Sequence, residues 1–177
     1  MTHAQIDAVF AKLEMKRNEL FDKLASYNTD ALNRKPDAES WSVIQVIEHL
    51  FVIERSIIAY IKKKSLDKAS LQKTGLKEWG RSLMLNLYLR SSKKFPAPIA
   101  VMPAIQYASL NEMRELWNAE RHEMKEAINA MPADMLSHNW FKHPAVGKLN
   151  LMQMFSFLEA HYDRHVRQIW HTIKEIA

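Results

Sequence analysis

The sequence predicts an all-α protein, a four-helix bundle with long crossover connections and a short extra helix. Apolar residues recur at three- and four-residue steps through most of the chain, and runs typical of β-strands are absent. Only 3 glycines are available for tight turns. The 177 residues suit one domain spanning 1–177. With 47% hydrophobic and 25% charged residues, the composition excludes an intrinsically disordered chain.

The first two helices are expected on either side of a polar connector. The first apolar stripe covers residues 6–27, and residues 28–39 are polar and contain Pro36, which predicts the connector. The second helix is expected to begin after Ser42. Ser42 and Gln45 have the spacing of a capping box, in which each side chain satisfies a free backbone amide of the other residue. The second stripe consists of Val46, Ile47, Leu50, Ile53, Ile57 and Ile61.

The third helix is expected to be the short extra one, after a connector at residues 62–75. One face of it would consist of Leu76, Trp79, Leu83 and Leu87. Residues 91–108 contain three prolines, which predicts a long loop rather than a helix. Such a length of chain allows a crossover from one end of the bundle to the other.

The last two helices are the clearest in the pattern. Ser109 has capping-box spacing before one apolar stripe, which ends near Pro132. Residues 133–149 are expected to form a loop. The last helix is expected to begin after Asn150, a good capping residue with Gln153 three positions on. Its stripe consists of Leu151, Met154, Phe155, Leu158, His161, Tyr162, His165, Ile169, Ile173 and Ile176.

Positive charge is concentrated in one stretch of the chain. The net charge is +5, yet the segment from Lys62 to Lys94 holds ten basic and two acidic residues. Such a segment suits a solvated helix face, or a surface that meets phosphate or an acidic partner. It lacks the interleaved aromatic residues or groove-reading helix of nucleic-acid-binding modules, so nucleic-acid binding is the least favoured alternative.

Several classes of protein are excluded by what the chain lacks. Without cysteine there is neither a disulfide scaffold nor a thiolate nucleophile, so any thiol chemistry needs a thiol from outside. No glycine-rich loop is present to hold a phosphate, which argues against a nucleotide-binding fold. Neither a signal-peptide pattern nor an apolar run of membrane-spanning length is found. We therefore expect a cytoplasmic protein with no membrane partner.

The residues that could carry chemistry are histidines on apolar stripes. His161 and His165 are four residues apart, so they share one face of the last helix. His49 occupies a stripe position in the second helix. Three imidazoles that meet at one point would hold a divalent metal and leave a position open for water or substrate. The alternative, that each is a core histidine bonded to a carbonyl or carboxylate, stays open on spacing alone.

The surrounding residues show no general base of a known motif, and no catalytic residue is assigned. Tyr follows His161, so the H-E-x-x-H metalloprotease motif is absent. Carboxylates could orient the histidines through their second ring nitrogens, although each also suits a surface charge. The candidates are Glu48, Glu54, Glu159 and Asp163. Gln45 could line the site or act only as a cap, and His143 could reach its rim from a loop.

Two parts of the chain resemble the DinB-like family. They are ESWSVIQVIEHL, which contains His49, and HPAVGKLN with the later run LEAHYDRHVRQI, which contains His161 and His165. The similarity spans most of the chain. It implies a four-helix bundle in which one histidine of the second helix and two of the last hold a divalent metal, here His49, His161 and His165. Arg164 stands where relatives often have another histidine.

The resemblance also implies an activity. Relatives include bacillithiol and mycothiol S-transferases and maleylpyruvate isomerases, which use a divalent metal to activate a low-molecular-weight thiol, and homodimers are common. We expect an enzyme that holds Zn²⁺ or Ni²⁺ and activates such a thiol, or water, for S-transfer to a small-molecule substrate or for hydrolysis. The alternative is a non-catalytic dimeric bundle, a stress or interaction protein with a vestigial metal site.

Overall fold

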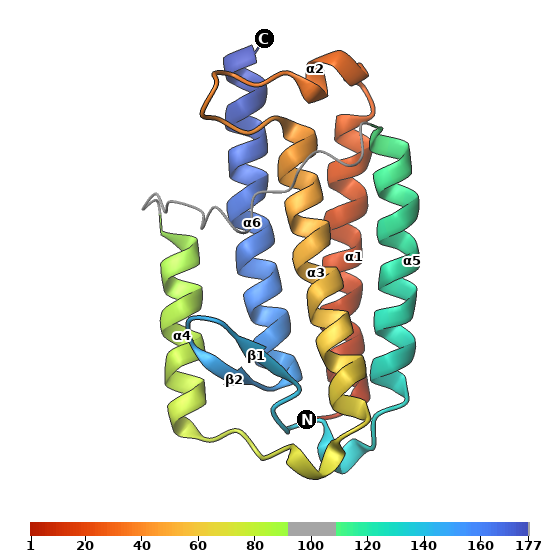
Figure 1. Cartoon of the computed structure of the whole chain (residues 1–177), viewed down its shortest axis with the longest axis vertical. Coiled ribbons are helices and arrows are strands. Elements are labelled where there is room, and N and C mark those ends of the chain that lie inside the picture. Colours follow the sequence, from red (N-terminus) through yellow and green to blue (C-terminus); the bar gives the residue numbers. More distant parts are fainter. Residues whose placement is uncertain (92–108, 177) are drawn as a thin grey trace.

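The chain folds almost entirely into α-helices (Figure 1), which confirms the all-α prediction. The computed structural model describes residues 1–91 and 109–176. None of the helices in these residues is long and apolar enough to cross a membrane. The elements are α1 (His3–Leu24), α2 (Thr29–Asn33), α3 (Val43–Ser65), α4 (Leu76–Arg90), α5 (Leu110–Asn129), β1 (Phe141–His143), β2 (Gly147–Leu149) and α6 (Leu151–Ile176), with 3-10 turns at Lys68–Ser70 and Ala133–Met135.

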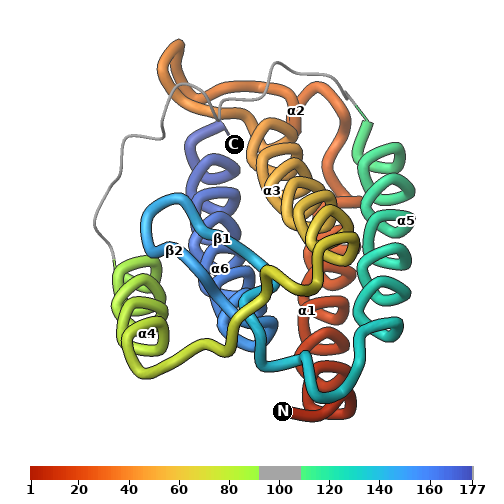
Figure 2. Tube along the Cα trace, turned by 60° about the horizontal axis from the view of Figure 1, so that its bottom comes forward, coloured from red at the N-terminus to blue at the C-terminus, as the bar shows by residue number. Residues whose placement is uncertain are grey.

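Four of the helices, α1, α3, α5 and α6, form the bundle (Figure 1). One cluster of buried side chains surrounds the first half of α1, at Ile6 and Phe10, and a second surrounds its last half, at Phe21 and Leu24. The helix α4 stands outside the bundle and packs against α6 and β2 (Figure 2). It runs parallel to α6, since both helices rise from the same end of the molecule (Figure 1).

The predicted helix starts at Ser42 and Asn150 are confirmed. The Gln45 amide N–H donates to Ser42 Oγ at 3.3 Å, and the Ser42 amide N–H donates to Gln45 Oε1 at 2.9 Å. Asn150 and Gln153 make the same reciprocal pair at 3.0 and 2.9 Å. Both boxes satisfy amides that the first turn of a helix leaves without an internal partner. They therefore fix where the two histidine-bearing helices begin.

Two segments differ from the expectation, and a third cannot be compared with it. The polar connector contains α2, whose first turn is capped by Asn28 Oδ1 accepting from the Ala31 amide at 2.8 Å. The loop at 133–149 contains the antiparallel hairpin β1–β2, which turns at Gly147 with a φ of 82°. Three-residue strands are too short to leave an alternating pattern in a sequence. The predicted loop at 91–108 lies, apart from its first residue, outside the described residues.

The helix α4 turns its apolar face away from the bundle. Its most buried residues are polar, with Ser82 and Asn86 only 4% and 8% exposed. Leu85 and Leu89 are partly buried against the core. The face that the sequence indicated is open to solvent, with Leu76 89% and Trp79 60% exposed. The periodicity thus predicted the helix correctly but could not say which neighbour its apolar side would meet.

A buried ion pair holds α3 against α5. Glu54 accepts hydrogen bonds from Arg121 Nε at 2.5 Å, from Arg121 Nη2 at 2.6 Å and from Trp117 Nε1 at 2.8 Å. Arg121 Nη1 also lies 3.1 Å from Glu14 of α1. Because His49 is on the same helix as Glu54, this network helps to fix the rotation of α3 that aims His49.

Replacing Arg121 by Leu is expected to lower the free energy of unfolding by about 3–5 kcal/mol, because it leaves the Glu54 carboxylate buried without a counter-charge. The double variant Glu54→Leu/Arg121→Leu should regain most of that loss. Urea unfolding followed by circular dichroism measures both. If Arg121→Leu lowered the free energy of unfolding no more than the exposed control Arg55→Leu does, the stabilising role of the pair would be contradicted.

Candidate metal centre

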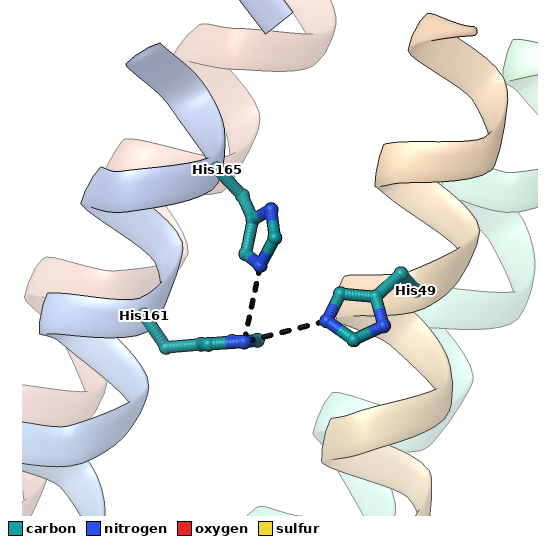
Figure 3. Close-up of side chains that lie close together, drawn as sticks. All are labelled: His49, His161 and His165. Atoms are coloured by element: carbon teal, nitrogen blue, oxygen red, sulfur yellow. Dashed lines mark hydrogen bonds between the residues drawn. The ribbon is translucent and has the colours of Figure 1, made fainter. Parts of the chain in front are cut away.

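Three histidines from two helices converge between α3 and α6 (Figure 3). The Nε2 atom of His161 lies 3.4 Å from Nε2 of His49 and 3.2 Å from Nε2 of His165. One ring nitrogen from each residue lies within 4.8 Å of the others, so the three side chains could hold a metal ion. We call these residues the histidine trio. Within the described part of the chain, no other group of histidine or carboxylate side chains is gathered in this way.

Helix geometry and aromatic packing together aim these rings. His161 and His165 lie one above the other on α6 because they are four residues apart. His49 faces them from α3 and is 7% exposed. The Trp41 ring meets His49 edge-on at 5.2 Å between centroids, and the Phe157 ring stacks on His161 at 5.4 Å. The aromatic rings restrict the rotamers of the histidines and keep water away from them.

A glutamine fixes the tautomer of one histidine. Gln168 Oε1 lies 2.8 Å from His165 Nδ1. An amide oxygen can only accept, so Nδ1 carries the proton and Nε2 offers its lone pair to the centre of the trio. Sequence analysis missed Gln168. The available signal was its position three residues after His165, which places it one turn further along the same side of α6.

Burial favours the uncharged form of His161 and His165. Desolvation, with a smaller contribution from the neighbouring His49, lowers the pKa of His165 to about 4. Desolvation lowers the pKa of His161 well below its ordinary value, and the nearby His165 and His49 lower it further. The physical cause is that a low-dielectric site disfavours an imidazolium, most of all beside other imidazoles. At neutral pH these two rings are therefore in the form that binds metal ions.

Three of the four carboxylates considered as orienting groups have other partners. Glu159 and Asp163 both accept hydrogen bonds from Lys16 of α1, each at 2.8 Å. Glu54 is occupied by its ion pair with α5. Glu48 is 1% exposed and Glu54 is 4% exposed, so the interpretation of these two as surface charges is wrong. The orienting role predicted for a carboxylate is filled at His165 by an amide instead.

Of the other candidates, His143 lies nearest to the trio. Its ring meets Phe157 at 4.6 Å between centroids, so one aromatic ring separates it from His161. Burial lowers the pKa of His143. Gln45 serves as the N-terminal cap of α3, as its alternative interpretation held. His122 and His171 pair with glutamates on exposed helix faces, away from the trio.

Two arginines of α6 hold α4 beside the trio. Arg164 Nη1 donates to the Ser91 carbonyl at 3.3 Å, and Arg167 Nη2 donates to the Leu89 carbonyl at 3.3 Å. Carbonyls at a helix C-terminus lack internal partners and carry partial negative charge, so cations stabilise them. Arg164, where relatives often have a histidine, here fastens a neighbouring helix.

The bundle and its histidine trio define the class to which the protein belongs. The family model for the DinB superfamily matches residues 12–169, and the chain belongs to this family. The uncharacterized protein YuaE of Bacillus subtilis (strain 168) is 26% identical to it over 153 residues, which cover 86% of this chain and 90% of that protein. No solved structure gives a significant match. The family recognised in the sequence is therefore confirmed.

The stability of the metal-free protein should fall in mild acid because of His165. Its pKa is lower in the folded state, about 4, than the ordinary 6.5 of the unfolded chain. Its contribution is therefore complete above pH 6.5 and is lost as the pH falls toward 4. By linkage the loss is roughly 2–3 kcal/mol.

Urea unfolding at a series of pH values, with metal removed by a chelator, measures this contribution. His165→Ala should make the pH dependence shallower over the same window, with the remainder due to His161, while the exposed control His171→Ala should leave it unchanged. Parallel curves for wild type and His165→Ala would refute the assignment to His165.

Proposed function

We propose that the protein binds one divalent metal ion, Zn²⁺ or Ni²⁺, through His49, His161 and His165. We further propose that it uses the ion to activate a low-molecular-weight thiol, or water, for S-transfer to a small-molecule electrophile or for hydrolysis. The single observation that carries the proposal is the convergence of three Nε2 atoms from α3 and α6. Family membership supports it, because the matched region of the DinB superfamily contains all three residues.

The donor set fits such an ion. Three neutral imidazoles suit Zn²⁺ and Ni²⁺, and they are typical of catalytic rather than closed structural sites, because a fourth position remains for water or substrate. Gln168 holds one ring in the ligating tautomer, as the outer hydrogen bonds of metal-binding histidines do. Within the described residues no carboxylate joins the trio to close it.

The chemistry divides between the ion and the chain. A bound divalent ion supplies a positive charge that lowers the pKa of a thiol or water beside it, which yields a nucleophile near neutral pH. The aromatic rings of Trp41 and Phe157 exclude bulk water from the histidines. The chain has no cysteine, so a reacting thiol has to come from solution.

Metal analysis tests the proposal. Purified protein reloaded with Zn²⁺ or Ni²⁺ should contain one ion per chain, and His165→Ala should lose it, because two imidazoles cannot retain the ion through dialysis. Gln168→Leu should weaken the affinity for the metal ion by about 10- to 100-fold, because it removes the hydrogen bond that fixes the tautomer and the orientation of the His165 ring. Elemental analysis and competition with a chromophoric chelator measure these effects.

A matched control and an activity readout accompany this test. His122→Ala removes an exposed histidine and should keep full metal content. The metal-loaded protein should accelerate attack of a small thiol on an aryl chloride, with release of chloride and a proton, and His165→Ala should not. Full metal content in His165→Ala would refute the assignment of the metal site to these three histidines. A loaded protein without thiol or hydrolytic chemistry would favour the non-catalytic alternative.

We also propose that two copies of the chain associate through the outer face of α4. Six large apolar side chains are exposed there, and together they present on the order of 700 Å² of surface, about one side of a standard protein interface. They are Leu76, Trp79, Leu83, Met84, Leu87 and Tyr88. Gly80 lies among them, and apart from its chain neighbours and the adjacent backbone of α4 nothing lies within 4 Å of the point where a Cβ would be. The missing side chain lets a second helix approach closely. In a dimer with a two-fold axis that helix would be α4 of the partner, with its own Gly80 at the interface.

Leu83→Glu should convert the dimer to a monomer, because it places a charge at the centre of the apolar face. Sedimentation velocity at micromolar concentration measures the change. Met15→Glu, at a residue 63% exposed on α1, is the matched control and should remain dimeric. A monomeric wild type, or a dimeric Leu83→Glu, would contradict the proposal.

A further inference from the structure

The buried side of α4 carries an amide oxygen without a partner. Asn86 is 8% exposed, and its Nδ2 atom donates to the Ser82 carbonyl at 3.0 Å. Because a carbonyl can only accept, this contact fixes which end of the amide is nitrogen. The opposite end, Oδ1, is buried and has no hydrogen-bond partner. The buried side of α4 therefore contains an unsatisfied hydrogen-bond acceptor.

An unsatisfied acceptor in such a place is unusual. A buried polar atom that leaves water without a new partner costs free energy, and most such atoms in folded proteins are satisfied. Leucine branches at the same position as asparagine and, although it is larger, carries no polar atom that burial would leave unsatisfied. The Oδ1 atom is therefore available to a partner that none of the described residues supplies.

The position of Asn86 along α4 places it level with the histidine trio. The bonds from Arg164 to Ser91 and from Arg167 to Leu89 bracket the register of α4 on α6, because they correspond to offsets of 73 and 78 residues. With the helices parallel, these offsets place Asn86 level with residues 159 to 164 of α6, a stretch that contains His161.

The same register places α4 beside the part of α6 that carries the histidine trio. On α6, Arg164 reaches toward α4, and His161 is 60° away around the helix, on the side that turns toward α3. His49 approaches the trio from α3. A molecule at the open position of the trio would lie over α6, between α3 and the buried face of α4, which packs against α6.

We infer that Asn86 is a specificity-determining residue. When the sulfur of a thiol occupies the open position of the trio, the Oδ1 atom of Asn86 accepts a hydrogen bond from an O–H or N–H group of the same thiol molecule. The ligand class is therefore a low-molecular-weight thiol that carries a hydroxyl or amide donor, in preference to a plain alkyl thiol. This inference rests on the proposed function.

The test compares thiols that differ only in this donor. The pairs are 2-mercaptoethanol with propane-1-thiol, and 3-mercaptopropan-1-ol with butane-1-thiol, and each pair exchanges a hydroxyl for a methyl group. Dissociation constants come from the thiolate absorption of the protein loaded with Co²⁺. The preference is the dissociation constant of the alkyl thiol divided by that of its hydroxyl partner. For at least one pair, this ratio should be roughly 5- to 10-fold larger in wild type than in the Asn86→Leu variant. Asn86→Ala should give the same loss of preference if the leucine variant folds poorly.

The outcomes separate the two proposals. Thiols that bind with the same hydroxyl preference in wild type and in both Asn86 variants would overturn the role of Asn86 and leave the proposed function standing. A failure of every thiol to bind the loaded protein would overturn the thiol-dependent part of the proposed function, and the inference with it. Asn111→Leu, at an exposed residue near the start of α5, is the control and should keep the wild-type preference.

A second readout does not depend on the metal. Asn86→Leu should raise the thermal unfolding midpoint of the metal-free protein, because it removes a buried acceptor that nothing satisfies. A residue with a purely structural hydrogen-bonding role would instead lower the midpoint when replaced. Gain of stability together with loss of hydroxyl preference is the expected signature of a residue kept for binding. A lowered midpoint would overturn the inference.

Discussion

The site depends on the fixed rotation and spacing of α3 relative to α6. One residue of slippage along either helix turns a side chain by 100° and moves it by 1.5 Å, which would carry an imidazole out of reach of the other two. Three kinds of contact prevent it. Buried aliphatic side chains fill the space between the helices, reciprocal caps set where each helix begins, and the Glu54–Arg121 pair holds α3 to α5. Tyr162 adds a hydrogen bond from α6 to the Lys16 carbonyl of α1 at 2.8 Å.

Burial serves the geometry and the electrostatics at once. The aromatic rings that fix the histidine rotamers also withdraw the histidines from water, and this withdrawal keeps His161 and His165 uncharged. Gathered imidazoles that were protonated would repel one another and force the helices apart. The bundle therefore tolerates polar rings in its interior because they are neutral, and the same neutrality is what a cation requires of them.

The sequence predicted the elements of this fold better than their neighbours. Apolar stripes and capping residues located α3 and α6, and the spacing of His161 and His165 placed them on one face. Amphipathic pattern reports that a helix has two sides, but not what each side meets, so the outward apolar face of α4 could not be foreseen. Convergence with His49 also depends on register between distant segments, which the family resemblance supplied. Gln168 and Asn86 act through single contacts that leave no periodic trace.

The attachment of α4 has a consequence for how the protein responds to its surroundings. This helix is joined to the bundle by arginines at one end and by the hairpin along its side, and it is a stiff rod whose two faces cannot move separately. A molecule on its outer surface and a molecule beside its inner surface would therefore contact the same rigid element. Any displacement of α4 that one of them causes would link the two affinities, and each would alter the other by the same factor.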